Sequence, residues 1–280
     1  MRWTIGKVKI TKIVELETTG GTRFILPQAG PGDIQKLPWL VPHFATEEGW
    51  LKLSVHSLVV ETPSRRIVVD TCLGNDKQGR KVPTWNNLQK PFLENMTRAG
   101  FPPDTIDTVL CTHLHVDHVG WNTRLVGSKW VSTFANARYV FGRTEYEHWE
   151  AQRDDLERAA VFNDSVQPIM EAGLADLVAG DHQLSEEITL IPTPGHSPGH
   201  MSIHIRSDGE EGLLIGDVAH HPCQMAHLDW SSTADYDAEQ SAAMRRELFS
   251  RFADTPTLVI GGHFSAGRLE RDGDAFRFMA

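Results

Sequence analysis

Three histidines and one aspartate fill four of the six positions between His113 and His118. Imidazole and carboxylate groups are the ligands that Zn²⁺ and similar cations prefer. His113, His115 and Asp117 alternate along the chain, so on an extended segment their side chains point to the same side. His118 breaks the alternation, which indicates a tight loop that gathers ligands for two ions. We therefore interpret this run as a metal site rather than as a solvated polar loop.

Three further segments each place a metal-binding residue type after an apolar run and a glycine. These residues are His196, Asp217 and His263. Small residues let the backbone come close to a site while the next residue projects into it. One histidine at a strand end is usually a packed or surface residue. Four such segments in one chain favour metal ligands instead.

Apolar, strand-like runs alternate with helical patterns along the chain, which is typical of an α/β protein. Strands are expected at 55–60, 66–70, 108–111, 138–141, 188–191, 201–205, 213–217 and 257–260. Helices are expected over 88–98, from a capping box at 144–147 toward residue 158, and over 238–252. Strand 108–111 delivers the histidine run. Its last residue, Cys111, is expected to be a buried small hydrophobe and not a ligand.

The composition is that of an ordinary globular protein, with 40% hydrophobic and 23% charged residues among 280. No linker divides the chain, so a single domain over 1–280 is expected. A net charge of -10 argues against a nucleic-acid partner. No apolar segment is long enough to cross a membrane or to act as a secretory signal. Three widely spaced cysteines form no disulfide framework, which fits a cytoplasmic location.

Residues 18–50 form an exception, because this segment is rich in glycine and proline and carries several aromatic residues. Loops of this length are uncommon unless they are functional or disordered. Disordered segments are poor in aromatic residues, so we expect an ordered flap or an oligomer contact. Its apolar surface favours a homodimer.

The whole set of motifs resembles the metallo-β-lactamase superfamily. The residues that carry the resemblance are His113-x-His115-x-Asp117-His118, Gly195-His196, Gly216-Asp217 and Gly262-His263. The resemblance implies a four-layer αβ/βα sandwich with a dinuclear site at one edge of two facing sheets. It implies that His113, His115 and His196 bind the first metal, that Asp117, His118 and His263 bind the second, and that Asp217 bridges the two. Two Zn²⁺ ions are the expected cofactors, with Mn, Fe or Co as alternatives.

Within the superfamily, several branches resemble this ligand pattern. They are glyoxalase II, tRNA-processing ribonucleases, acyl-homoserine lactonases and methyl parathion hydrolase. The net charge disfavours the ribonucleases, and β-lactamases of the commonest subclass carry a cysteine where this chain has Asp217. Segments 70–75 and 216–221 look most like the lactonase and methyl parathion hydrolase branch. Well-known lactonases have a tyrosine at the position of His220, a departure that weakens strict lactone specificity.

The implied reaction is hydrolysis of a small ester, lactone or organophosphate by a hydroxide that bridges the two metals. Such a water has its pKa lowered toward ~7, so no protein nucleophile is needed. Asp217 would fix the metal spacing, Asp117 would also shuttle a proton to the leaving group, and His220 would contact the substrate. The alternative is a thioesterase of the glyoxalase II kind. A β-lactamase, an oxidoreductase and a non-catalytic metal-binding protein are less favoured.

Residues outside the ligand set are expected to support it. Asp70 ends a strand and is expected to orient a ligand imidazole, as metal-bound histidines require. His200 lies near the ligands in sequence and is a second candidate for such a role. Trp121 directly follows the histidine run and is the best candidate for a wall of an apolar substrate pocket.

Overall fold

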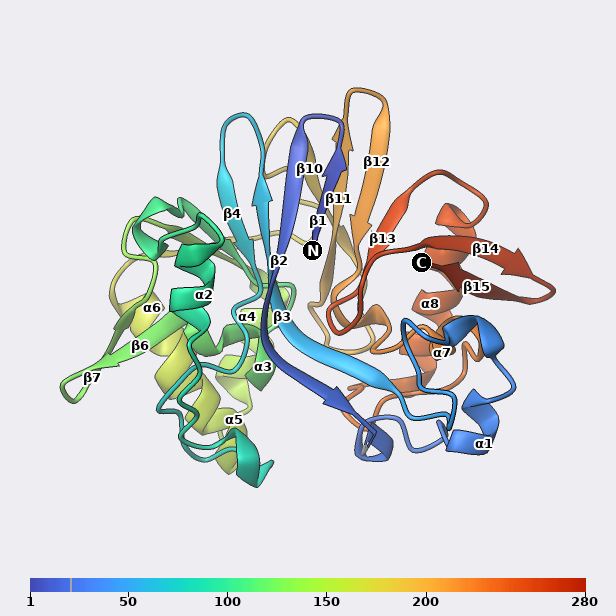
Figure 1. Ribbon diagram of the computed structural model, residues 1–280. Coiled ribbons are helices and arrows are strands. Elements are labelled where there is room, and N and C mark those ends of the chain that lie inside the picture. Colours follow the sequence, from blue (N-terminus) through green and yellow to red (C-terminus); the bar gives the residue numbers. More distant parts are fainter. Residues whose placement is uncertain (21) are drawn as a thin grey trace. The chain divides into compact units, whose positions relative to one another are not determined.

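The computed structural model describes residues 1–20 and 22–280, which form two compact units. Unit 1 comprises Met1–Glu15 and Val55–His182, and unit 2 comprises Leu16–Ser54 and Gln183–Ala280. Each unit has its own sheet and helices (Figure 1).

The sheet of unit 1 has seven strands in the order β1-β2-β3-β4-β5-β8-β9. The strands are β1 (Arg2–Ile5), β2 (Val8–Thr19), β3 (Lys52–Glu61), β4 (Arg66–Val69), β5 (Thr108–Leu110), β8 (Arg138–Gly142) and β9 (Ala175–Val178). Strands β4, β5, β8 and β9 are parallel, and Val69, Leu110 and Val140 lie in register. Such parallel strands are buried on both faces and are therefore rich in apolar residues. Their C-terminal ends meet at one edge, where Asp70 and the histidine run follow.

Short helices and one hairpin complete unit 1. The helices are α2 (Phe92–Arg98), α3 (Val116–Val119), α4 (Arg143–Ala151), α5 (Leu156–Val161), the π-helix η6 (Phe162–Val166) and α6 (Gln167–Glu171). Three 3₁₀ turns are η3 (Pro83–Trp85), η4 (Pro103–Thr105) and η5 (Gly120–Asn122). The hairpin of β6 (Thr123–Val126) and β7 (Lys129–Ser132) projects from the helices of this unit (Figure 1).

The sheet of unit 2 has four strands in the order β10-β11-β12-β13. They are β10 (Ile188–Pro192), β11 (Met201–Ser207), β12 (Glu210–Leu214) and β13 (Leu258–Ile260), with only the β12–β13 pair parallel. The other elements are η1 (Thr22–Phe24), α1 (Pro31–Ile34), η2 (Pro38–Leu40), η7 (Gly216–Val218), α7 (Cys223–Ala226), α8 (Ala238–Phe252) and the hairpin β14 (Arg268–Asp272) and β15 (Ala275–Met279). One apolar cluster joins α8, the hairpin and residues 26–51.

The aromatic-rich segment 18–50 is folded in the structure, with three short helices along its described part. Phe44 is buried and packs against Phe264 and Phe278, and Trp39 lies partly buried against the same core. Phe24 and Trp50 are 57% and 45% exposed. The segment therefore contributes to the core of unit 2 and also presents apolar surface.

Most predicted elements are confirmed, and two helix predictions are wrong in part. The helix expected over 88–98 begins only at Phe92, because the backbone at 88–90 instead pairs with Asn75 and Asp76. The helix expected to run toward residue 158 ends at Ala151. A second helix, α5, starts at Leu156, because Asp155 accepts two backbone N–H groups as its N-cap.

The predicted capping box at 144–147 is also wrong. Helix α4 begins at Arg143 with Gly142 as its N-cap, so Thr144 lies inside the first turn and no side chain caps the helix. Likewise, strand β12 ends at Leu214, and Asp217 lies in the turn η7 rather than at the end of the strand. The backbone amide of Asp217 donates to a histidine instead of extending the sheet.

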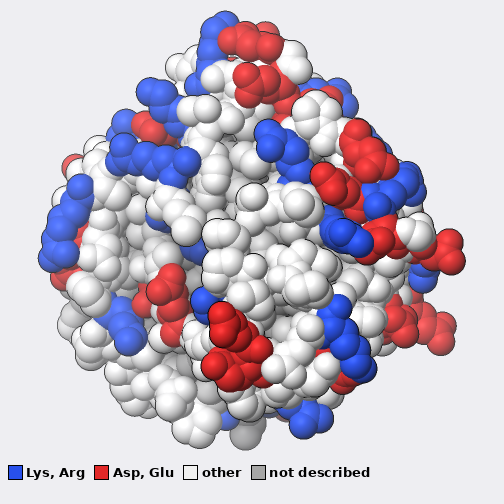
Figure 2. All heavy atoms as spheres, turned by 45° about the vertical axis from the view of Figure 1, so that its right-hand side comes forward, with Lys and Arg blue, Asp and Glu red and all other residues white. Residues whose placement is uncertain are grey.

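Charged side chains of both signs are interspersed on the face of the molecule drawn in Figure 2. In the part of the chain that the structure describes, no helix has the length and apolarity that crossing a membrane requires.

Candidate metal centre

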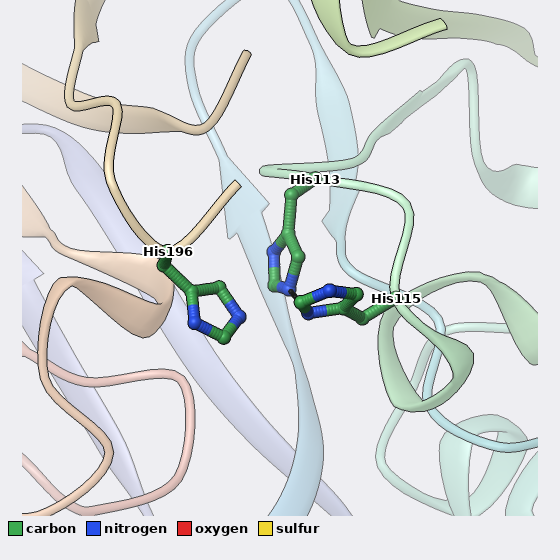
Figure 3. A group of neighbouring side chains, drawn as sticks. All are labelled: His113, His115 and His196. Carbon is green, nitrogen blue, oxygen red and sulfur yellow. Dashed lines mark hydrogen bonds between the residues drawn. The ribbon is translucent and has the colours of Figure 1, made fainter. Parts of the chain in front are cut away.

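The predicted ligands of unit 1 lie on the loop after β5 and in helix α3. Figure 3 shows the rings of His113 and His115 projecting from this loop. Nε2 of His113 and Nδ1 of His115 are 3.0 Å apart, and the ring centroids of His113 and His118 are 4.0 Å apart. Asp117 Oδ1 lies 3.8 Å from Nε2 of His118. The structure thus brings all four predicted residues of this unit together.

Asp70 supports this cluster, as predicted from its place at a strand end. One carboxylate oxygen accepts the backbone N–H of Thr112 at 2.7 Å. The other accepts from the Thr112 hydroxyl at 2.9 Å and from Nδ1 of His118 at 2.8 Å. With Nδ1 as the donor, Nε2 is the ring atom of His118 that faces Asp117. This arrangement is typical of metal-bound histidines, whose second nitrogen is held by a carboxylate.

Glu145 is a second support, which the sequence interpretation missed. Its side chain is buried and accepts the backbone N–H of Leu114 at 3.0 Å. The same oxygen accepts Nε1 of Trp149 at 2.6 Å, and the Trp149 ring packs edge-on against His115. Glu145 therefore fixes the backbone between the first two histidines. Its position three residues after Gly142 gave no signal of this role.

Glu15 is a third support that the sequence did not indicate. Its carboxylate accepts the backbone N–H groups of Leu73 and Gly74 at 2.8 and 3.1 Å, and Nε1 of Trp121 at 2.6 Å. Burial raises the pKa of Glu15 above its ordinary value, and these three donors act against that rise. Trp121 is only 5% exposed and stacks on Phe92, so it belongs to the packed interior of unit 1.

In unit 2, three imidazoles surround one carboxylate oxygen. Asp217 Oδ2 lies 3.0 Å from Nε2 of His263, 3.2 Å from Nε2 of His220 and 3.5 Å from Nε2 of His196. All four side chains are buried. His196 follows β10 (Figure 3), Asp217 and His220 belong to the turn after β12, and His263 follows β13. The three predicted residues converge, and His220 joins them as a fourth donor.

Glycines permit this convergence, as the sequence pattern indicated. A Cβ on Gly262 would collide with Oδ1 of Asp217, and the amide of Gly262 donates to the carbonyl of Gly216 at 2.9 Å. Gly195 adopts φ +137° against the backbone of Ser241, a conformation that L side chains rarely adopt. These two positions bring the ligand-bearing turns closer than larger residues would allow.

The histidines of unit 2 are also held at their second nitrogen. Nδ1 of His196 donates to Asp235 at 2.8 Å, and Nδ1 of His263 donates to the carbonyl of Ser54 at 3.2 Å. Burial raises the pKa of Asp235, while the charges of His220 and Arg245 lower it. His200 supports Asp217 itself, since its Nε2 accepts the Asp217 amide at 3.0 Å. The role expected for His200 is thus one of positioning.

This donor set fits a divalent metal. His196, Asp217 and His220 each offer one ligand atom, and these atoms lie within 4.8 Å of one another. Imidazole nitrogen and carboxylate oxygen are ligands of Zn²⁺ and of other first-row cations. Burying a carboxylate is costly unless a cation or several donors accompany it. A bound cation would meet that requirement.

A family model described as the metallo-beta-lactamase superfamily matches residues 50–263. The chain belongs to the metallo-β-lactamase superfamily. The match begins in unit 2, spans the histidine run of unit 1 and ends at His263. The predicted fold class and enzyme class, a metal-dependent hydrolase, are confirmed.

Individual relatives point in the same direction. An N-acyl homoserine lactonase of Bacillus thuringiensis is 27% identical over 225 residues, covering 76% of this chain and 82% of the lactonase. The solved structure of AidC, described as a dizinc quorum-quenching lactonase in complex with a product, has a TM-score of 0.81 at 18% identity and covers 100% of this chain and 96% of AidC. A probable metal-dependent hydrolase from Staphylococcus aureus has a TM-score of 0.78 at 21% identity, covering 99% and 98% of the two chains. These likenesses in structure show the fold.

Proposed function

We propose that this superfamily member is a dinuclear-metal hydrolase that opens lactones and also cleaves related small esters or organophosphates. The observation that carries the proposal is the arrangement of three imidazole Nε2 atoms within 3.5 Å of one oxygen of Asp217. The N-acyl homoserine lactonases among the relatives support the choice of a lactone as substrate.

The proposed ligand assignment follows the superfamily pattern. His113, His115 and His196 bind one metal, Asp117, His118 and His263 bind the other, and Asp217 binds both. Zn²⁺ is the proposed metal in each position, because nitrogen-rich sets with carboxylates suit it and AidC is described as dizinc. The two metals would lower the pKa of a bound water and polarise the substrate carbonyl or phosphoryl group.

The chain's own groups carry the remaining steps. Asp117 is half-buried on α3 and is proposed to move a proton to the leaving alkoxide. His220 is buried, and its Nδ1 has no hydrogen-bond partner among the residues that the structure describes. We propose that this nitrogen donates to the substrate oxygen, in place of the tyrosine hydroxyl that well-known lactonases carry there.

Metal content and substrate range test the proposal together. The purified protein should carry two metals per chain, and chelation should abolish hydrolysis that Zn²⁺ then restores. Asp217→Asn should lose metal and activity, whereas the exposed Asp274→Ala should keep both. One metal or none in the wild-type protein would contradict the dinuclear mechanism.

The substrate panel should contain N-acyl homoserine lactones, γ-lactones, aryl esters, a paraoxon-type triester, S-lactoylglutathione and a chromogenic cephalosporin. We expect the highest kcat/KM for a lactone and measurable turnover of esters or the triester. Turnover of the thioester alone would support the glyoxalase II alternative and overturn this proposal. Turnover of the cephalosporin alone would assign a β-lactamase.

Two expectations about the protein's context remain proposals. We propose a homodimer, because Phe24, Trp50 and Tyr236 of unit 2 are 57%, 45% and 61% exposed, and large exposed apolar groups mark contact surfaces. Light scattering of the wild type and of Trp50→Ser would test this.

We also propose a cytoplasmic location, since Cys72, Cys111 and Cys223 are buried thiols outside any disulfide. Cell fractionation would test it.

The domain organisation also remains a proposal. We propose that residues 1–280 fold as a single domain that includes both units, because the family model matches parts of each. A single cooperative unfolding transition, coincident by two spectroscopic probes, is the expected result. Two separate transitions would contradict it.

A further inference from the structure

Arg245 on helix α8 is completely buried and is one of the largest buried side chains of the protein. Its neighbour in sequence, Arg246, is exposed. Arginine is almost never fully buried unless its charge is paired, because removing the guanidinium from water is costly. A buried arginine in an otherwise amphipathic helix therefore calls for a specific set of partners.

Those partners come from three turns of unit 2. Nε donates to the carbonyl of Leu228 at 3.0 Å, and Nη1 donates to the carbonyl of Val218 at 3.2 Å. Nη2 donates to the hydroxyl of Ser231 at 3.4 Å, and Nη1 lies 3.8 Å from Asp235 Oδ2. The planar guanidinium directs its N–H groups toward all of these acceptors at once, which the single ammonium group of a lysine could not do.

Two of these contacts lead directly to proposed metal ligands. Val218 follows Asp217 in the turn η7, where Asp217 itself has non-helical φ and ψ of -103° and 24°. The side chain of Asp235 is fully buried, and its other oxygen accepts a hydrogen bond from Nδ1 of His196 at 2.8 Å. One cation thus holds the turn that carries Asp217 and also neutralises the carboxylate that orients His196.

We propose that Arg245 is a positioning residue that sets the Asp217 turn and the Asp235–His196 pair in the arrangement that binds metal. This inference rests on the proposed function of the site. It assigns to α8 a role in the metal centre although the helix supplies none of the ligands.

The first test uses the metal-free protein, so it does not depend on metal binding. The ring Nδ1–H groups of His196 and His118 each donate to a buried carboxylate, that of Asp235 and that of Asp70. Each of these protons should give a low-field resonance. Arg245→Met should abolish or strongly shift the His196 resonance and leave the His118 resonance as an internal reference. Arg245→Lys should retain the His196 resonance, because it still supplies a charge near Asp235. Arg246→Met, the matched control, should change neither.

The second test measures metal affinity by competition with a chelator. Arg245→Met should bind metal about 10–100-fold more weakly, the effect usual for groups that support metal ligands. Arg245→Lys should also bind more weakly, because Val218 loses its donor, and Arg246→Met should match the wild type. Thermal unfolding of each metal-free variant accompanies the measurement. If Arg245→Met does not fold, the affinity of Arg245→Lys is compared with those of the wild type and Arg246→Met.

The outcomes separate the two proposals. Arg245 variants that unfold at lower temperature yet keep the His196 resonance and wild-type metal affinity would overturn the positioning role. A wild-type protein that binds no metal would contradict the proposed function. In that case loss of the His196 resonance in Arg245→Met would still support the positioning of His196, and its retention would refute it.

Discussion

Asp70 and His118 are joined by a 2.8 Å hydrogen bond inside unit 1, and Asp70 makes it from the left-handed conformation at φ +54°. That conformation is uncommon for an aspartate. It turns the carboxylate from the end of β4 toward Thr112, whose amide and hydroxyl it also binds. One side chain thus links the ends of two parallel strands to a proposed ligand.

We predict that Asp70→Asn weakens metal binding about 10–100-fold, which is the usual loss when a group that supports a ligand is removed. The amide keeps the volume but has one oxygen in place of two, so it cannot accept from the Thr112 backbone amide and from Nδ1 of His118 at the same time. Metal affinity by chelator competition is the measurement, and the exposed Asp104→Asn is the control. Equal affinities in the two variants would contradict the role given to Asp70.

Gly262→Ala tests the close approach of two turns in unit 2. The added Cβ would collide with Oδ1 of Asp217, so the carboxylate or the turn must move. We expect weaker metal binding together with a loss of about 1–3 kcal/mol in the free energy of unfolding, as for other overpacked sites. Gly32→Ala introduces the same methyl group where no atom lies within 4 Å. Comparable losses in both variants would show that the collision is not the cause.

The proposed ligands could be predicted from the sequence because each stands in a short motif next to an apolar strand. The local sequence pattern, an apolar run followed by a glycine, was enough to place His196, Asp217 and His263 at the ends of strands or just beyond them. It could not show that β12 ends at Leu214, because that depends on where the ladder with β11 stops.

The supporting groups could not be predicted, since their roles arise from contacts between residues far apart in sequence. Glu15 accepts hydrogen bonds from Leu73, Gly74 and Trp121, which lie 58 to 106 residues away in sequence. Glu145 is a second case, because its orientation is determined by the backbone amide of Leu114, 31 residues away. Local propensity is a weak prior wherever tertiary contacts compete with it.

Glu15→Ala should destabilise the metal-free protein by more than any single hydrogen bond would suggest. It leaves the amides of Leu73 and Gly74 and the indole of Trp121 without this acceptor, and each unsatisfied buried donor costs about 1–3 kcal/mol. Chemical denaturation should therefore show a loss of at least about 2 kcal/mol. Glu17→Ala, an exposed position on the same strand, should cost little. Combined with Trp121→Phe in a double-mutant cycle, Glu15→Ala should show a coupling of about 0.5–3 kcal/mol, and strict additivity would argue against the contact.

His221 lies in the core of unit 2 in a defined neutral form. Its Nε2–H donates to the carbonyl of Phe44 at 2.9 Å, and its Nδ1 accepts the amide of Cys223 at 3.1 Å. Complete burial lowers the pKa of His221 from 6.5 to about 4, with the bond to Phe44 acting in the opposite direction. A second proton on Nδ1 would face the Cys223 N–H, so the folded protein resists protonation of this ring.

The consequence is a pH-dependent stability. Between pH 6.5 and 4 the unfolded chain binds a proton at His221 and the folded chain does not, so this residue's contribution is complete above pH 6.5 and is lost as the pH falls. The loss approaches about 3 kcal/mol near pH 4, at 1.36 kcal/mol per pKa unit. Denaturant unfolding of the metal-free wild type and of His221→Gln, which keeps a donor for Phe44, should give curves that converge as the pH decreases. The stability–pH curve of His43→Gln, a substitution at an exposed position, should run parallel to that of the wild type. A parallel curve for His221→Gln as well would show that the His221 ring titrates normally in the folded state.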